Sequence, residues 1–183
     1  MARKSSRNTQ APLREFIKEN EGTLYSFIEL MVPKKEVRES VLLETFREFG
    51  SFFRRQHTKC APSELKTKLF TIAWSLIVQS QDEDGMRWLD GRDTRKMGEW
   101  DVDLLSKWST TRTVDDTLRH SLFNRIQLVS NEFKAPLVLK DILGLEDEEI
   151  MRVLGSRWGV YRHRLHRGRM DLLHELKGQE KSA

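Results

Sequence analysis

Residues 144–169 read GLEDEEIMRVLGSRWGVYRHRLHRGR, and the charge of this stretch changes sign midway. Four acids stand in a row from Glu146 to Glu149, whereas residues 156–170 hold five arginines, two histidines and no acid. A solvated helix face usually mixes the two signs, so this run favours an anionic partner for its cationic half.

Two helices separated by a tight turn are predicted here. The acids fall in the first turn of a helix over 146–154, where the positive end of the helix dipole favours them. Gly155 predicts the end of that helix, and Ser156 is a candidate cap for a second helix over about 157–176. A short helix, a glycine turn and a longer cationic helix together predict a helix-turn-helix.

The second helix is expected to have a packing face and a cationic face. At about 100° per residue, the packing face holds Tyr161, Leu165, Gly168 and Leu172, and the small Gly168 lets a neighbouring helix approach. The other face would enter the major groove of DNA, with outer residues at base edges and flanking arginines at phosphates. The predicted DNA-binding residues are Arg157, Arg162, His163, Arg164, His166, Arg167 and Arg169.

A second interpretation of this stretch stays open, namely a helical hairpin whose basic face is only solvated. Helix-turn-helix patterns are weak signals when taken alone. The absence of any acid over fifteen residues favours the DNA-binding interpretation.

The composition excludes several classes of protein. The 183 residues include 32 Lys plus Arg and 28 Asp plus Glu, a net charge of +4, so the distribution of charge matters more than its sum. The one cysteine, Cys60, allows no disulfide framework within the chain. Residues 1–11 do not resemble a secretory signal, and the most apolar run, 70–78, is too short to span a bilayer. We expect a soluble, cytoplasmic protein with no membrane contact of its own.

Apolar residues recur at helical spacing on both sides of an acidic segment, which predicts an all-α fold. Four stripes precede the segment, at 13–17, 24–31, 37–53 and 65–77, and shorter ones follow it. We therefore predict two small helical domains joined by an acidic linker. The expected boundaries are a disordered basic tail at 1–11, an N-terminal helical domain at 12–81, the linker at 82–112, a C-terminal helix-turn-helix domain at 113–177 and a tail at 178–183.

The linker contains or adjoins three of the five tryptophans, Trp88, Trp100 and Trp108. Residues 82–103 hold eight acids, four bases and three glycines, a composition typical of a linker. The tryptophans either dock the linker onto its own domains or contact a partner.

Residues 133–169, FKAPLVLKDILGLEDEEIMRVLGSRWGVYRHRLHRGR, resemble the C-terminal promoter-reading domain of bacterial RNA polymerase sigma factors, in particular the small extracytoplasmic-function (ECF) type of the sigma-70 superfamily. That family's pattern runs roughly R-x-V-x-x-L-x-D-x-x-G-L-x-x-x-E-I-A-x-x-L-G-x-x-x-G-T-V-x-S-R-L-x-R-A-R. The matching positions are Leu139, Asp141, Gly144, Leu145, Glu149, Ile150, Leu154, Gly155, Gly159, Arg164, Leu165, Arg167 and Arg169. The departures are Lys134 for Arg, Val160 for Thr, Tyr161 for Val, His163 for Ser and Gly168 for Ala.

Residues 36–53, EVRESVLLETFREFGSFF, resemble the family's A-E-D-L-x-Q-E-x-F helix, which binds a coiled coil of the polymerase largest subunit. Arg38, Ser40 and Leu43 stand where Ala, Asp and Gln are usual. The resemblance implies that this helix binds core RNA polymerase, and we expect that binding to survive. The implied contact residues are Glu39, Leu43, Glu44 and Phe46.

Residues 66–81, KTKLFTIAWSLIVQSQ, resemble the family's W-L-x-x-I-A-R-N-x-x-x-D-x-x-R helix, which meets the near promoter element. Neutral or acidic residues replace several of its cationic and polar positions: Trp74, Ser75, Gln79 and Asp82. The candidate replacement charges for the near element are Arg54, Arg55, Lys66 and Lys68.

The resemblance implies a sigma factor of the bacterial cytoplasm. Such a protein binds core RNA polymerase, recognises double-stranded promoter DNA at two elements and helps melt the nearer one, and an anti-sigma factor is a further candidate partner. The altered positions in 66–82 motivate an alternative, a degenerate sigma-like regulator that binds polymerase or DNA without initiating transcription. A stand-alone helix-turn-helix regulator is a third reading.

The sequence predicts no enzyme, no cofactor and no metal site. It holds no Gly-rich phosphate loop and no metal-ligand spacing. His163 and His166 share one helix face, but the surrounding arginines would repel a metal dication. Cys60 is expected to be an ordinary loop cysteine.

Overall fold

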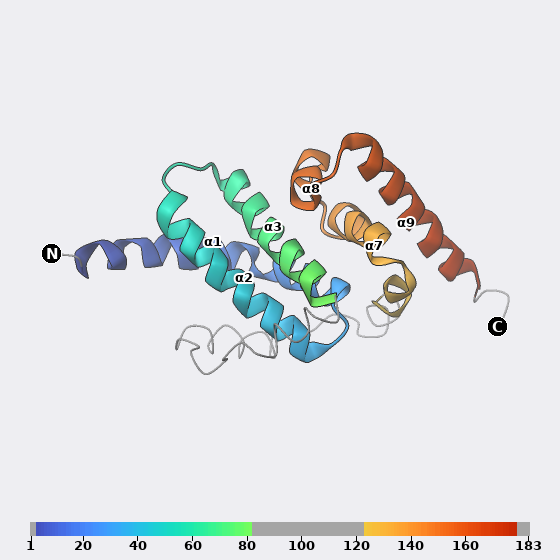
Figure 1. Ribbon diagram of the computed structural model, residues 1–183, viewed down its shortest axis with the longest axis horizontal. Coiled ribbons are helices and arrows are strands. Elements are labelled where there is room, and N and C mark those ends of the chain that lie inside the picture. Colours follow the sequence, from blue (N-terminus) through green and yellow to red (C-terminus); the bar gives the residue numbers. More distant parts are fainter. Residues whose placement is uncertain (1–2, 82–122, 179–183) are drawn as a thin grey trace.

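The computed structural model describes residues 3–81 and 123–178, and it describes side chains over 11–81 and 123–175. Every regular element in these ranges is a helix, which confirms the predicted all-α fold. Three helices, α1 to α3, form an N-terminal region, and a short helical segment at 123–128 forms a C-terminal region with α7, η2, α8 and α9 (Figure 1). The predicted linker and its tryptophans lie outside the described residues.

Helix α1 (Arg3–Met31) contains both of the first two predicted stripes. It also begins inside segment 1–11, for which the sequence predicted a disordered tail. Residues 3–10 contain neither glycine nor proline and continue the helix of the buried Leu13 and Ile17, although α1 passes through Pro12, which has no N–H to donate.

Helices α2 (Lys35–Gln56) and α3 (Pro62–Gln81) complete the N-terminal region. Pro62 occupies the first position of α3, where its missing N–H costs nothing, and Glu64 accepts the Ala61 N–H at 2.8 Å. Aromatic rings fill the interior between the helices, with Phe16 stacked on Phe49 at 5.3 Å between ring centroids. The predicted stripes of α2 and α3 are buried in this interior.

An ion pair that is mostly buried fixes the turn between α1 and α2. Arg38 Nη1 lies 3.0 Å from Glu29 Oε1, and the two side chains are only 16% and 13% exposed. Arg38 stands where the ECF pattern has Ala. In this chain the arginine pairs with Glu29 and so links α2 to α1.

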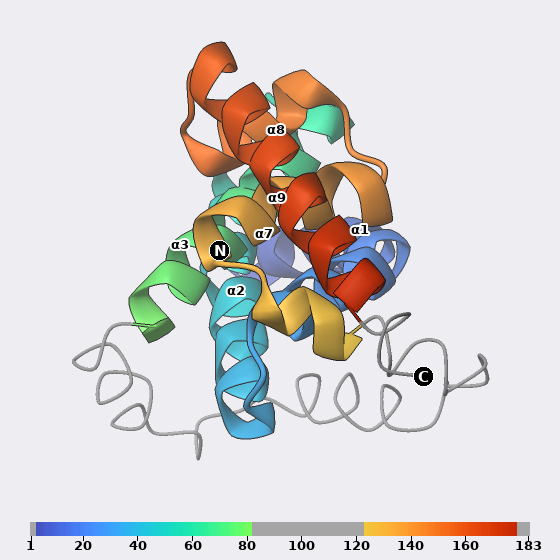
Figure 2. The same cartoon turned by 90° about the vertical axis from the view of Figure 1, so that its right-hand side faces the viewer.

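The C-terminal region begins with a short helical segment at 123–128, followed by α7 (Asn131–Leu137), which continues as the π-helix η2 (Val138–Ile142). Gly144 has a φ of 67°, a left-handed conformation that glycine adopts without strain, and it turns the chain into α8 (Asp147–Leu154). Helix α9 (Trp158–Gly178) then packs along α7 (Figure 2).

The two regions pack against each other. Helix α3 lies against α8, and residues from both regions form one buried apolar cluster. Gln127 Nε2 donates across the junction to the Leu30 carbonyl at 2.8 Å. The contact between the regions was not predicted, because a periodic stripe shows that a face is buried and does not show what covers that face.

Candidate nucleic-acid interface

A tight glycine turn joins α8 to α9, as the sequence predicted. Gly155 adopts φ 59° and ψ 31°, and its N–H and that of Ser156 donate to the Arg152 and Met151 carbonyls, which closes α8. The prediction that Ser156 caps α9 is wrong. Its hydroxyl is buried without a hydrogen-bond partner, because Ser156 belongs to the end of α8 and α9 begins only at Trp158.

Acidic side chains stabilise the first turn of α8. Glu149 Oε2 accepts the Glu146 N–H at 3.3 Å. Asp147 accepts a hydrogen bond from Tyr161 Oη at 2.8 Å, and Lys140 Nζ lies 2.8 Å from the same carboxylate oxygen. One acid of α8 therefore connects the helices on both sides of it.

The pKa values of this cluster move in the directions that its contacts require. Burial and the bond to Asp147 raise the pKa of Tyr161 well above its usual range. The hydrogen bonds from Lys140 and Tyr161 hold the pKa of Asp147 below its usual value. The bond between Lys140 and Asp147 also raises the pKa of Lys140. The cluster therefore keeps its charges at neutral pH and fixes α9 relative to α8.

The packing face of α9 is the one predicted. Tyr161 and Leu165 are buried, Leu172 is partly buried, and Gly168 faces α7. A Cβ at Gly168 would lie 2.5 Å from the Phe133 carbonyl oxygen, closer than any methyl group tolerates. Glycine at this position therefore allows the close approach of α7 and α9.

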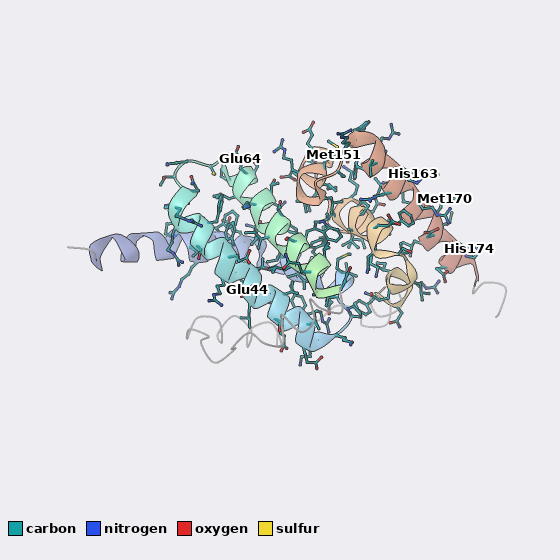
Figure 3. The ribbon with its side chains drawn as sticks, in the orientation of Figure 1. Glu44, Glu64, Met151, His163, Met170 and His174 are labelled. Atoms are coloured by element: carbon teal, nitrogen blue, oxygen red, sulfur yellow. The ribbon has the colours of Figure 1, made fainter. Side chains whose placement is uncertain are left out.

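The outer face of α9 is exposed and cationic even though the two regions pack together. Arg162, His163, His166 and Arg167 are all exposed, and Arg157 precedes them at the turn. Figure 3 shows His163 on the outer side of α9, away from the N-terminal region. This arrangement leaves the face free to approach a negatively charged surface.

Three of the seven predicted DNA-binding residues lie in ion pairs within the chain. Arg169 makes two hydrogen bonds to the Asp141 carboxylate, at 2.6 and 2.8 Å, and this contact raises its pKa. Arg164 lies 3.7 Å from Glu132, and Arg167 lies 3.0 Å from Asp171. Because the Arg169 contact is bidentate, this side chain serves mainly to hold α9 against η2.

Apolar side chains on α9 were missed by the sequence reasoning. Trp158, Val160 and Met170 are each about half exposed. The Arg162 guanidinium lies over the Trp158 ring, 5.6 Å from its centroid. The spacing of these two residues, one turn apart, was a signal for this contact.

The predicted polymerase-binding residues of α2 differ in accessibility. Glu39 is exposed beside Lys35 at 3.9 Å, and Leu43 is half-buried. The Glu44 side chain is only 12% exposed, and its carboxylate lies 3.6 Å from Arg47 Nη1. Phe46 is buried at 4% exposure, so it supports the helix from inside. A partner at this face of α2 would meet Glu39, Leu43 and Glu44.

The candidates for the near promoter element lie at the end of α2 and the start of α3. Arg54 and Arg55 are exposed and bond to Ser51, Lys66 is half-buried, and Lys68 is exposed with its ammonium 5.6 Å from the centroid of the Phe52 ring. Of the altered positions of α3, Trp74 packs against Phe27. Ser75 and Gln79 are exposed and bonded to each other, and Asp82 lies outside the described residues.

Within residues 3–81 and 123–178, no group of His, Cys, Asp or Glu side chains could hold a metal ion. The helices described there include none with the length and apolar character needed to cross a bilayer.

Comparison with known proteins gives a partial similarity. The chain is 43% identical over 58 residues to the ECF RNA polymerase sigma factor SigE of Mycolicibacterium smegmatis. That relative is a sigma factor. The match spans 32% of this chain and 23% of the relative, so it covers less than a quarter of the relative's length. No protein-family model matches the chain. The similarity to ECF sigma factors is therefore distant and partial.

Proposed function

We propose that this protein is an ECF-type sigma factor, which binds core RNA polymerase and directs transcription from specific promoters. The observation that carries the proposal is the helix-turn-helix with an exposed cationic outer face on α9. The partial similarity to an ECF sigma factor supports it independently.

The DNA contacts that we propose divide by position on α9. Arg162, His163 and His166 would reach base edges in the major groove of the distal promoter element, and Arg157 and Arg164 would hold phosphates. Arg164, Arg167 and Arg169 would approach DNA only by sharing or leaving their carboxylate partners.

The proposed contact with polymerase lies on α2. Glu39 and Glu44 would supply anionic contacts, and Leu43 would pack against a coiled coil. The Glu39→Arg/Glu44→Arg double variant should weaken binding to core polymerase, and unchanged binding would remove this assignment. Lys35→Glu, on the same exposed face, is a matched control for the effect of changing charge alone.

Arg54, Arg55, Lys66 and Lys68 are the proposed cationic contacts to the near element. The altered positions of α3 favour a second candidate function, a sigma-like regulator that binds polymerase or DNA without initiating. Trp74 packs against Phe27, and Ser75 and Gln79 supply no positive charge. On either proposal the protein acts in the bacterial cytoplasm without catalysis or cofactor of its own, and an anti-sigma factor remains a proposed partner.

Transcription in vitro separates the two candidates. The full chain would be mixed with core polymerase of the same organism on fragmented genomic DNA, and the starts of the transcripts sequenced. Starts that share two upstream elements would establish the sigma factor and define its promoter. Stable polymerase binding without starts would establish the regulator, and absence of polymerase binding would contradict both roles at the polymerase.

A further inference from the structure

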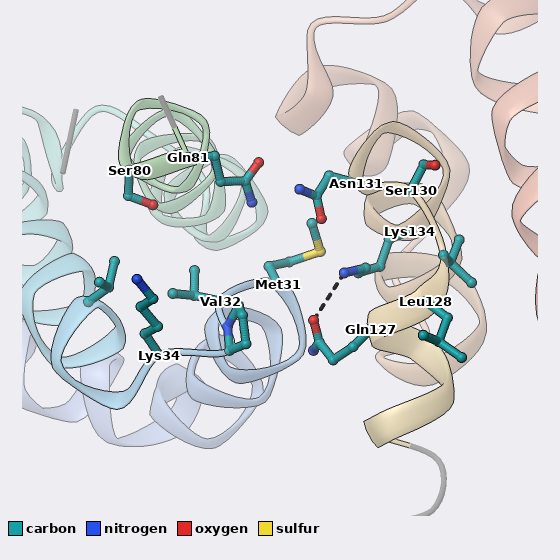
Figure 4. A pocket seen from close by; sticks show the side chains of 13 residues that line it. Met31, Val32, Lys34, Ser80, Gln81, Gln127, Leu128, Ser130, Asn131 and Lys134 are labelled. Carbon is teal, nitrogen blue, oxygen red and sulfur yellow. Dashed lines mark hydrogen bonds between the residues drawn. The ribbon is translucent and has the colours of Figure 1, made fainter. Parts of the chain in front are cut away.

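A cavity of about 520 Å³ lies where the two helical regions meet (Figure 4). Its walls come from the end of α1, the loop into α2, the end of α3 and residues 127–134. A volume of this size is in the range of small-molecule sites, roughly 300–1,000 Å³. The proposed function makes no use of it.

The feature that distinguishes this cavity is a buried ammonium group. Lys134 is 3% exposed, and Nζ donates one hydrogen bond, to Gln127 Oε1 at 3.1 Å. An ammonium has three donors, and none of the described carboxylates forms an ion pair with this one. Burial lowers the pKa of Lys134 to about 8, because the charged ammonium loses its hydration.

The structure holds Lys134 in place. Gln127 donates through Nε2 to the Leu30 carbonyl at 2.8 Å, which turns its amide oxygen towards the lysine. Figure 4 shows the side chains of Gln81 and Asn131 reaching into the same space from α3 and α7. A charged donor and two amides therefore converge from two segments, α3 and α7.

The rest of the lining is largely apolar. Met31, Val32, Pro33, Val37, Leu128 and Val129 supply it. The second lysine at the cavity, Lys34, is exposed, so its charge is already solvated. One desolvated positive charge suits a ligand with one negative charge, because a phosphate dianion would need further buried cations.

We propose that this cavity binds a small organic monocarboxylate with a short apolar body. The carboxylate accepts hydrogen bonds from Lys134 Nζ and the Asn131 amide, and the apolar body lies against Met31, Val32 and Val37. The site does not depend on the proposed function in transcription. Because its walls belong to both helical regions, a bound carboxylate also stabilises their packing.

Carbon-13 NMR of the full chain, labelled at the ε-carbon of lysine, tests the site with sodium hexanoate as the probe. The signal of Lys134 is identified by its loss in Lys134→Met. We expect hexanoate to shift this signal saturably and the neutral analogue hexanamide to leave it in place. Absence of a saturable shift, or an equal shift with hexanamide, would overturn the proposal.

Two variants sharpen the test. Lys134→Met should weaken hexanoate binding, followed by calorimetry, by about tenfold or more, since it removes a charged hydrogen-bond donor. Lys34→Met, at the exposed lysine of the same cavity, should change it far less. Circular dichroism checks that both variants fold. Equal binding by Lys134→Met and the wild type would place the probe elsewhere and contradict the site.

The acids that follow Gln81 in the sequence provide a further control. Asp82, Glu83 and Asp84 come directly after a residue that lines the cavity. Hexanoate should bind equally well before and after these three are changed to amides. Binding that appears only after the change would mean that the chain supplies its own carboxylate, and the proposal of an external ligand would fail.

Discussion

The N-terminal and C-terminal regions differ in the contacts that position the helices within each of them. In the N-terminal region, rings of α1, α2 and α3 pack in two groups, Phe16 with Phe49 and Phe53, and Phe27 with Phe70 and Trp74. In the C-terminal region, a glycine contact and a few directional polar bonds fix α9 against α7, η2 and α8.

This difference separates stability from orientation. Apolar burial is large and non-directional, so the aromatic interior stabilises the N-terminal region without fixing each side chain to one partner. Hydrogen bonds and close backbone contacts add less free energy but fix angles. A helix proposed to read DNA needs its orientation fixed, and α9 carries the directional contacts.

Removing Phe49 should have the largest effect on the free energy of unfolding. Its side chain is fully buried and contacts the rings of Phe16, Phe52 and Phe53. Phe49→Ala should destabilise the protein by about 3–5 kcal/mol, measured by urea unfolding. The half-buried Phe52 provides a control, and an equal loss in Phe52→Ala would contradict the assignment of stability to the interior.

The buried charge of Lys134, at the junction of the regions, should lower the free energy of unfolding, whereas the ring of Phe49 raises it. Its lowered pKa means that the unfolded chain binds more protons between about pH 8 and the ordinary value of 10.5. The stability of the wild type should therefore rise with pH across this window. The stability of Lys134→Met relative to the wild type should therefore be greater at neutral pH than at pH 10, by roughly 2–3 kcal/mol.

Urea unfolding of both proteins at pH 7.5 and pH 10 measures this difference without interference from other titrating groups, which the two proteins share. A constant difference at both pH values would show that Lys134 titrates normally. It would also contradict the proposed carboxylate site, which depends on a desolvated ammonium at Lys134.

Gly168→Ala tests the close contact in the C-terminal region. The added methyl group would meet the Phe133 carbonyl oxygen at 2.5 Å, so α7 and α9 must separate. We expect a loss of about 1–3 kcal/mol and weaker DNA binding. Gly159→Ala is the matched control on the same helix, because nothing lies within 4 Å of its added Cβ. A stable Gly168→Ala variant with unchanged DNA binding would show that the helix spacing is not critical.

The faces of α9 could be predicted from the sequence because helical periodicity alone decides them. Tyr161 and Leu165 had to lie opposite His163 and Arg167 in any helix through this stretch. Gly168 could be predicted as a contact point because it was the one residue without a side chain on the packing face.

The partners of the polar side chains could not be predicted in the same way. Arg169 lies 28 residues from Asp141, and its choice between this carboxylate and DNA depends on tertiary structure. The contact of α3 with α8 escaped for a related reason, since each region alone has enough apolar stripes to form a core. Ser156 was wrongly predicted to cap α9. Its backbone N–H instead donates to the Met151 carbonyl in the left-handed turn at Gly155, which ends α8.

Tyr161→Phe should cost about 1 kcal/mol, the usual net contribution of one hydrogen bond. The ring remains to fill the interior, and Asp147 keeps its contact with Lys140, so little else changes. The raised pKa of Tyr161 also means that the wild type loses stability as the pH rises above the ordinary tyrosine pKa of about 10. Urea unfolding at pH 7 and pH 11 should show that this alkaline loss is smaller in Tyr161→Phe.

The smallest effect should appear in the salt dependence of DNA binding. Each phosphate contact contributes about 0.9 to the slope of log K against log salt concentration. Arg157→Ala, which removes an exposed arginine that we propose to hold a phosphate and that has no carboxylate partner among the ion pairs of the described residues, should reduce that slope by roughly this amount. Arg169→Ala should change it less, because the Asp141 carboxylate already neutralises this guanidinium. Equal reductions, measured by fluorescence anisotropy with the full chain and a short duplex, would mean that Arg169 leaves Asp141 for DNA. The orientation of α9 would then have to be kept by its other contacts, those of Tyr161 and Gly168 among them.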